Sequence, residues 1–193
     1  MFTGIITNKG RVTSITENKL VIKSSLAKDL NIGDSILVNG ICLTVVEVSG
    51  DTFSVDFISE TKDKTNIGNL ETDSFVNLEL PATPSSLLSG HIVQGHIDTT
   101  AEIKEIIEES NQKTFVFEIR DNLSKYMVSK GSVTINGVSL TLIEVQSKKF
   151  SVGVIPHTYN ATTFSKLEVG DTVNVEVDVL AKYVERLIKE NNG

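Results

Sequence analysis

Short stretches rich in valine, isoleucine, threonine and phenylalanine recur along the chain, and Gly and Asn-Gly positions separate them. In the first half these stretches span residues 12–21, 36–48, 52–58 and 75–80, and similar ones follow in the second half. Alternate residues of a strand point to opposite faces, so one face can be buried while the other stays polar. Short strands with tight turns between them predict an all-β chain built as antiparallel barrels or sandwiches.

The second half of the chain repeats the first half at an offset of 97 residues. Residues 39–79 align without a gap to residues 136–176, and 17 of these 41 positions are identical. Upstream, Phe2-Thr3-Gly4 aligns with Val93-Gln94-Gly95. We therefore expect two copies of one small domain, at residues 1–85 and 91–178, joined by a linker at residues 86–90.

Few helices are expected within the two copies. In the first copy, short helical turns are predicted at Ser25–Leu30 and after Glu60-Thr61. The equivalent positions of the second copy are Ser124–Val128 and the residues after His157-Thr158.

The segment after the second copy, residues 179–193, has a different pattern. Leu180, Val184, Leu187 and Ile188 are spaced by three and four residues, which predicts an amphipathic helix. Its apolar face either packs on its own barrel or associates with other copies of the chain, and the sequence leaves both readings open.

Length, charge and cysteine content exclude several classes of protein. The 193 residues suffice for two small domains, and the net charge of −7 argues against a nucleic-acid partner. Cys42 is the only cysteine, so neither an intrachain disulfide nor a cysteine-rich metal site is expected. No apolar run approaches the roughly 20 residues of a spanning helix, and the N-terminus does not resemble a signal peptide. We expect a cytoplasmic protein with no membrane partner.

Polar residues repeated inside the apolar strands are candidates for a binding site. Thr44 and Thr141 are equivalent, as are Cys42 and Ser139, and the strand period places residues 42 and 44 on one face. Small side chains in such a row suit a flat heteroaromatic ring, whose edge could bond to strand amides and hydroxyls. Because threonine is also an ordinary strand residue, its repetition is explained equally by the duplication alone.

One difference between the copies bears on acid–base chemistry. His96 stands where the first copy has Ile5. A histidine beside Gly95 at the start of a strand could carry a proton near neutral pH. The alternative is a structural or solvated histidine.

Four segments in register carry a resemblance to a known family. Met1–Ile6, Asn39–Thr44, Gly90–Asp98 and Gly137–Thr141 together resemble riboflavin synthases, and the resemblance covers the whole chain. It implies two tandem six-stranded antiparallel Greek-key barrels and a homotrimer held by the C-terminal helices. It also implies that two molecules of 6,7-dimethyl-8-ribityllumazine exchange a four-carbon unit, giving riboflavin and 5-amino-6-ribitylamino-uracil, without a metal or other cofactor.

The resemblance also proposes site residues. From the first copy it implies substrate contacts by Gly4, Ile5, Ile6, Cys42, Leu43, Thr44, Asp56, Phe57, Ile58, Ser59, Glu60 and Thr61. From the second copy it implies contacts by Gly95, His96, Ile97, Ser139, Leu140, Thr141, Gly153, Val154, Ile155, Pro156, His157 and Thr158, with Lys130 reaching a ligand from a neighbouring chain. At position 157 the family often has an acidic residue, so His157 departs from its pattern.

By the same resemblance, the active site forms between the first barrel of one subunit and the second barrel of another. The matching residues are Phe2, Ser35, Cys42, His96, Thr141 and Asp178. We expect His96 and Ser35 to carry protons, Cys42 to shape the pocket and Phe2 to position a ring.

Two other classes of protein compete with the enzyme. A non-catalytic lumazine- or flavin-binding protein of the same fold loses site residues, typically in one barrel, whereas both copies here keep the Leu-Thr strand and the downstream threonine. A structural β-protein would bind no chromophore. Association of the trimer with a surrounding lumazine synthase shell is left open.

Overall fold

The computed structural model describes residues 1–120 and 123–191, and these residues form two closed barrels of six antiparallel strands each. Residues 192 and 193, which belong to the terminal segment expected to be helical, lie outside the described residues. The first barrel contains β1 (Asn8–Ile15), β2 (Lys19–Lys23), β3 (Ser35–Val38), β4 (Ile41–Ser49), β5 (Thr52–Asp56) and β6 (Phe75–Glu79). The second contains β7 (Thr99–Glu108), β8 (Lys113–Ile119), β9 (Ser132–Ile135), β10 (Val138–Val145), β11 (Lys149–Val154) and β12 (Thr172–Val177).

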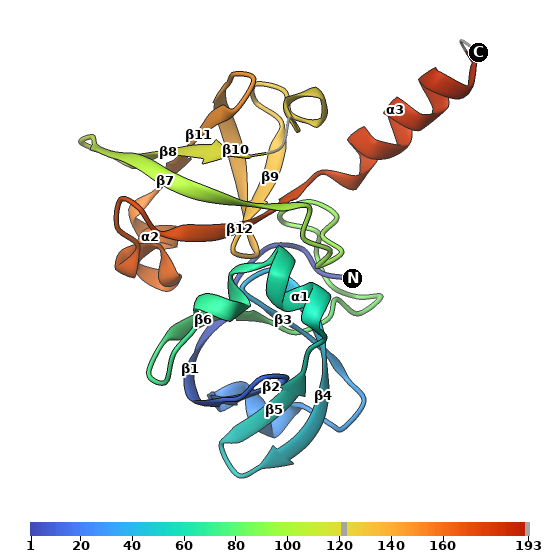
Figure 1. Cartoon of the computed structure of the whole chain (residues 1–193), viewed down its shortest axis with the longest axis vertical. Helices are drawn as coiled ribbons and strands as arrows, with labels where there is room; N and C mark the ends of the chain where they lie inside the picture. The colour runs from blue at the N-terminus through green and yellow to red at the C-terminus, as the bar shows by residue number, and fades with distance from the viewer. Residues whose placement is uncertain (121–122, 192–193) are drawn as a thin grey trace.

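The two barrels have the same strand order. The first closes as β1-β2-β5-β4-β3-β6, and the equivalent strands of the second follow the same path around its barrel. Figure 1 shows the barrels one above the other. The prediction of two six-stranded antiparallel barrels is thus confirmed.

Short helices lie where the sequence predicted helical turns. They are η1 (Ser25–Asp29), α1 (Ser59–Lys64) and η2 (Asn66–Asn69) in the first copy, and η3 (Ser124–Tyr126), α2 (Pro156–Ala161) and η4 (Thr163–Lys166) in the second. The hydroxyl of Thr65 accepts from the N–H of Ile67, and that of Thr162 accepts from Phe164. Equivalent threonines therefore cap the start of η2 and η4.

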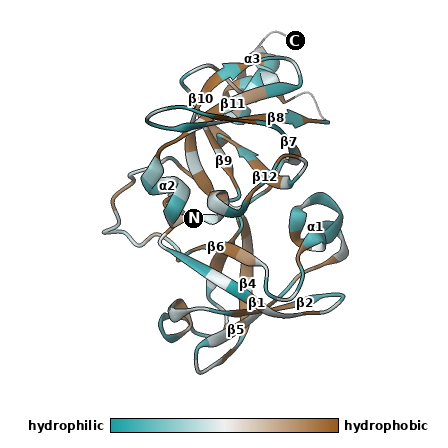
Figure 2. Cartoon of the chain, turned by 90° about the vertical axis from the view of Figure 1, so that its left-hand side faces the viewer, coloured by the Kyte–Doolittle hydropathy of each residue, from teal (hydrophilic) through white to brown (hydrophobic). Residues whose placement is uncertain are grey.

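The alternation of residues along the strands separates core from surface. On β4, Ile41, Leu43 and Val45 are buried in the first core, while Cys42 and Thr44 point outward. β10 repeats this pattern, with Ser139 and Thr141 outward. Each barrel encloses its own apolar core, and apolar residues concentrate on the strands around it (Figure 2).

The barrels meet at two equivalent Asn-Gly turns. Asn39-Gly40 and Asn136-Gly137 all have positive φ, between 45° and 83°, as a type I′ hairpin turn requires. The two turns touch: a Cβ on Gly40 would lie 2.7 Å from the backbone nitrogen of Gly137. Only glycine permits this approach, so the turns set the distance between the barrels.

Buried asparagines tie the turns to the strands around them. Asn174 on β12 donates to the carbonyl of Asn39 at 2.8 Å, and Asn77 on β6 donates to the carbonyl of Asn136 at 2.9 Å. Asn66 completes the network, because its amide donates to Asn136 and accepts from Asn174. Each barrel thus satisfies buried polar groups of the other, which fixes their relative orientation.

The terminal helix α3 (Val179–Asn191) follows the second barrel directly and projects away from it (Figure 1). The carboxylate of Glu185 accepts from Lys125 at 2.6 Å and from the hydroxyl of Tyr126 at 2.5 Å. Leu180, Val184 and Ile188 remain more than half exposed. The apolar face of α3 is therefore largely uncovered by the chain's own barrel. Within the described part of the chain, no helix is both long and apolar enough to span a membrane.

Candidate functional site

The segment before each barrel crosses to the opposite barrel. The N–H of Cys42 on β4 donates to the carbonyl of Gly95 at 2.9 Å, and the N–H of Ser139 on β10 donates to that of Gly4 at 2.8 Å. Beyond these glycines, Ile97 packs on the first core and Ile6 on the second. Residues 4–6, which the sequence counted with the first copy, thus lie against the second barrel, and residues 95–97 lie against the first.

The crossing segments leave no space at these contacts. Gly4 and Gly95 have φ of +77° and +80°. A Cβ on Gly95 would lie 2.5 Å from the Cβ of Cys42, and one on Gly4 would lie 2.6 Å from that of Ser139. Glycine is therefore required both for its backbone conformation and for the close approach.

The first site is a cavity of about 310 Å³ beside β4. Its wall is formed by Cys42 from β4, by Glu60 and Thr61 from α1, and by Gly95 and His96 from the crossing segment. Lys64 also lines it and forms an ion pair with Glu60 at 2.6 Å. The cavity joins a backbone edge and a hydroxyl to apolar surface from Ile41, Ile58 and Ile97, which suits a flat polar ring.

The second site brings equivalent elements together and adds a histidine. Nδ1 of His91 lies 2.7 Å from Oγ of Ser139, while its Nε2 is buried without a hydrogen-bond partner among the described residues. Burial lowers the pKa of His91, and the negative charge of Asp178 opposes that shift. The ring is therefore neutral near pH 7, and a neutral imidazole can accept a proton.

The sequence offers no reason to single out His91. It precedes the part of the second copy that aligns with the first, so comparing the copies could not single it out. Its burial and its contact with Ser139 arise because the N–H of His91 donates to the carbonyl of Thr3 in the crossing segment. Only the tertiary structure makes these three residues neighbours.

Phe2 was expected to position a ring. Its side chain has no exposed surface and packs between the barrels with Leu37 and Val93, against Cys42. It also pairs with Val93 through backbone hydrogen bonds. Phe2 therefore lies behind the first pocket, where it could position a ring only through the residues that it supports.

Four other expected contact residues face the cores. Leu43 and Phe57 are buried in the first core, and Leu140 and Val154 in the second. Their side chains shape the barrel interior, so a contact between these residues and a ligand would have to involve their backbone atoms. Other expected positions that reach the surface at least in part are Ile5, Ile6, Thr44, Asp56, Ile58, Ser59, Glu60, Thr61, Thr141, Gly153, Ile155, Pro156, His157 and Thr158.

The remaining candidates lie around the two sites. Ser35 on β3 pairs with Thr44 but is not part of the cavity wall. Asp178 follows β12 and accepts from the N–H of Leu180 at 3.0 Å, so it caps α3. Lys130 lies in an exposed turn with φ of 67°. Nowhere in residues 1–120 and 123–191 do three His, Cys, Asp or Glu side chains gather as a metal site would require.

The short helices beside the two sites lie apart from each other in the chain. α1 marks the first site and α2 the second, and both views place these helices on opposite sides of the junction (Figures 1 and 2). The fold and the paired sites define a class of protein, a duplicated barrel in which a segment from each half contacts the outward face of a strand in the other half.

Comparisons with known proteins specify this class. Residues 3–81 and 94–178 match the family model of the lumazine binding domain. Riboflavin synthase from Mycobacterium tuberculosis is 42% identical over 98% of this chain and 98% of its own length. That from Bacillus subtilis is 40% identical over the whole chain and 92% of its own length. The chain belongs to the riboflavin synthase family.

Solved structures of LumP share this fold. LumP complexed with riboflavin superposes with a TM-score of 0.85 and 30% identity, covering 92% of this chain and 99% of LumP. LumP complexed with 6,7-dimethyl-8-(1'-D-ribityl) lumazine gives a TM-score of 0.83 at 28% identity.

Proposed function

We propose that this protein is a riboflavin synthase, which converts two molecules of 6,7-dimethyl-8-ribityllumazine into riboflavin and 5-amino-6-ribitylamino-uracil. One molecule gives a four-carbon unit to the other, and every atom of the two substrates appears in the two products. The observation that carries the proposal is the pair of equivalent sites, because a reaction between two copies of one substrate requires two similar pockets. Full-length similarity to riboflavin synthases supports the enzyme over the non-catalytic binding protein.

In this proposal the active site forms between two chains. The sites of one chain lie on opposite sides of its junction, so the two rings can meet only if the first barrel of one subunit faces the second barrel of another. Holding them in contact replaces a bimolecular encounter with a positioned one. Lys130, exposed in its turn, would then reach a ligand from the neighbouring chain.

The substrate rings would lie against the outward face of β4 and β10. Cys42, Thr44 and Thr61 would hold one ring in the first pocket with Gly95 and His96, and Ser139, Thr141 and Thr158 would hold the other with Gly4 to Ile6. His91 and Ser139 would accept the proton from the ring-conjugated methyl group, because the neutral imidazole bonds directly to the hydroxyl. His96 and Ser35 would move protons on the first-barrel side, and Asp178 would stabilise positive charge on His91.

The assembly proposed is a homotrimer held by α3. The exposed apolar residues of α3 and the cavity of about 510 Å³ between α3 and η3, lined by Tyr126, Val128 and Val184, support this use of the helix. Deleting residues 179–193 is expected to reduce oligomer size and activity together. Undiminished activity in a monomer of confirmed mass would contradict a site shared between chains.

The proposed activity is tested by mixing the purified protein with 6,7-dimethyl-8-ribityllumazine. Riboflavin absorbance should appear without added metal or nucleotide, and bound but unconverted lumazine at high protein concentration would favour the binding protein. A mass measurement on protein isolated from its source also tests enclosure in a lumazine synthase shell.

We assign the protein to the cytoplasm, where reducing conditions keep the lone Cys42 as a thiol.

A further inference from the structure

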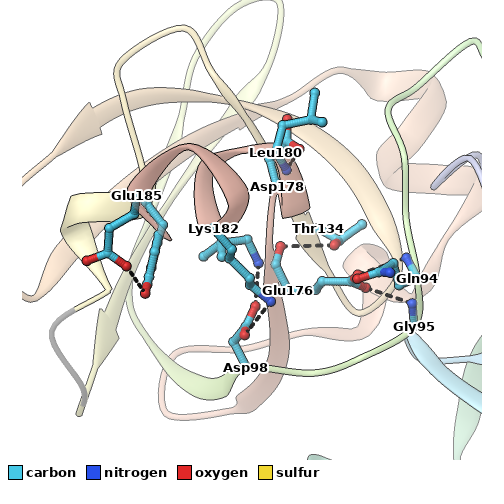
Figure 3. A network of polar contacts seen from close by, with 11 residues as sticks. Gln94, Gly95, Asp98, Thr134, Glu176, Asp178, Leu180, Lys182 and Glu185 are labelled. Atoms are coloured by element: carbon cyan, nitrogen blue, oxygen red, sulfur yellow. Dashed lines mark hydrogen bonds and ion pairs between the residues drawn. The ribbon is translucent and has the colours of Figure 1, made fainter. Parts of the chain in front are cut away.

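Two buried carboxylates hold the crossing segments. Glu79 on β6 and Glu176 on β12 are equivalent in the two copies, and their exposed fractions are only 4% and 2%. Glu176 accepts from the N–H of Gln94 at 2.8 Å and from that of Gly95 at 2.9 Å (Figure 3). Glu79 accepts from the N–H of Thr3 at 2.7 Å and from that of Gly4 at 3.0 Å. Each carboxylate thus binds two consecutive amides of the segment that precedes its own barrel.

The same glycines contact the opposite barrel through their carbonyls. Glu176 binds the N–H of Gly95, whose C=O accepts from Cys42 in the first barrel. Glu79 binds the N–H of Gly4, whose C=O accepts from Ser139 in the second barrel. A short chain of hydrogen bonds therefore runs from each glutamate to the pocket of the other half. Because the glycines already touch Cys42 and Ser139, a small shift of either segment displaces a pocket wall.

We propose that Glu79 and Glu176 are positioning residues that act crosswise: Glu176 sets the geometry of the first-barrel pocket and Glu79 that of the second. The proposal rests on the proposed function, because it takes these pockets as the substrate sites. Neither glutamate lines the first cavity, so each acts through the segment that it holds.

The surroundings of the two carboxylates are consistent with this role. A buried carboxylate is costly unless its oxygens are bonded, and the N–H donors meet that need. Glu176 is also close to charges at the base of α3, because Asp98 accepts from the N–H of Val177 at 2.9 Å and pairs with Lys182 at 2.6 Å (Figure 3). Burial raises the pKa of Glu176 to about 7, the two amides and Lys182 lower it, and Asp98 raises it. At pH 8 the carboxylate is therefore ionised and accepts from both amides.

Cys42 gives a reporter of the first pocket alone, because it is the only cysteine of the chain. The experiment measures its rate of modification by Ellman's reagent at pH 8 in the full-length protein. Glu176→Gln keeps the shape of the side chain but turns an NH₂ group toward one of the amides. We expect this variant to raise the rate roughly 10-fold. Glu79→Gln should leave it within about 2-fold, because that glutamate holds the other segment.

A second reporter reverses the comparison. With Cys42→Ser and Ser139→Cys combined, the only thiol lies in the second pocket, and Glu79→Gln should now accelerate its modification while Glu176→Gln should not. Glu168→Gln is the matched control, because it removes an exposed negative charge from the second barrel and should change neither rate. Equal acceleration of both thiols by either variant would indicate general loosening and overturn the proposal.

Turnover separates this proposal from the proposed function. Glu176→Gln should lower kcat/KM for the lumazine roughly 10-fold, mainly through KM, and Glu176→Asp should recover part of the loss because it keeps the charge. Wild-type protein that makes no riboflavin would overturn the proposed function and leave the thiol result intact. Active wild-type protein with unchanged thiol rates in both glutamine variants would overturn only the crosswise positioning.

If Glu176→Gln does not fold, the wild-type protein still gives a test. Hydrogen exchange should be slow at the amides of Gln94 and Gly95 and at those of Thr3 and Gly4, since each is bonded to a buried carboxylate. Rapid exchange at these four amides would also overturn the proposal.

Discussion

The two pockets are built alike but differ in the groups beside β4 and β10. Both have an outward row of small polar residues, a short helix that carries a threonine, and a glycine segment from the other half of the chain. The first has Cys42, with the Glu60–Lys64 ion pair in its wall. The second has Ser139 bonded to a buried neutral histidine, His91, near the charge of Asp178.

This difference separates binding from chemistry. The shared parts are those that hold a flat ring, so they serve both substrate molecules equally. The parts that differ include the buried histidine His91, and in the proposed function this residue gives the second pocket the larger share of proton transfer. A duplicated fold can therefore keep two equivalent binding sites and specialise one of them with a few side chains.

The strongest test of this comparison is substitution of the two histidines. His91→Asn can keep the hydrogen bond to Ser139 but removes the proton acceptor, so kcat should fall about 1000-fold. His96→Asn, in the first pocket, should lower kcat only about 10-fold. Steady-state riboflavin formation measures both, and titration with riboflavin confirms that the variants still bind. A larger loss of kcat in His96→Asn than in His91→Asn would place proton transfer in the first pocket.

The junction should show a smaller asymmetry in stability. Asn174 bonds to both Asn39 and Asn66, whereas the amide of Asn77 bonds to Asn136 and accepts from the N–H of Thr163. Asn174 also accepts from the N–H of Asn66, so more buried partners lose a bond when it is removed. We expect Asn174→Ala to lower the free energy of unfolding by about 3 kcal/mol and Asn77→Ala by about 2 kcal/mol. Chemical denaturation measures both, and equal losses would show that the network is energetically symmetric.

The shared parts of the pockets should respond alike. Thr44→Val and Thr141→Val each remove one outward hydroxyl at equivalent positions of β4 and β10. Each should raise KM for the lumazine about 10-fold with little change in kcat. Kinetics that assign the loss to kcat in one variant alone would show that these threonines also differ in role.

The two buried glutamates should differ in the pH dependence of stability. Burial raises the folded-state pKa of Glu176 to about 7, whereas the pKa of this group in the unfolded state is lower. Between these two pKa values, the folded state holds a proton that the unfolded state has released. The contribution of Glu176 to stability is thus present at acidic pH and is lost as pH rises toward 7, by about 1 kcal/mol per pH unit. Burial also raises the pKa of Glu79, but less.

Between pH 5 and 7, we therefore expect Glu176→Gln to remove more of the pH dependence of the free energy of unfolding than Glu79→Gln does. The measurement is the free energy of unfolding of each variant minus that of the wild type across this range. Identical differences at every pH would contradict the raised pKa of Glu176.

The sequence predicted the fold well because its signals are local and repeated. Alternation along the strands, the Asn-Gly turns and the constant offset of 97 residues all indicate the same pair of barrels. The outward row of Cys42 and Thr44 also followed from the strand period. The side chains of Leu43 and Phe57 lie in the first core, since a matching motif includes core residues along with their pocket neighbours.

The sequence by itself determined two like barrels, their polar rows and the amphipathic helix, since each depends on residues close together in the chain. Only the tertiary structure decided that residues 4–6 complete the second pocket and residues 95–97 the first. It also decided that His91 meets Ser139 and that Glu79 and Glu176 hold the crossing segments. Each of these contacts joins residues at least 48 positions apart, and no local pattern in the chain encodes a pairing across two barrels.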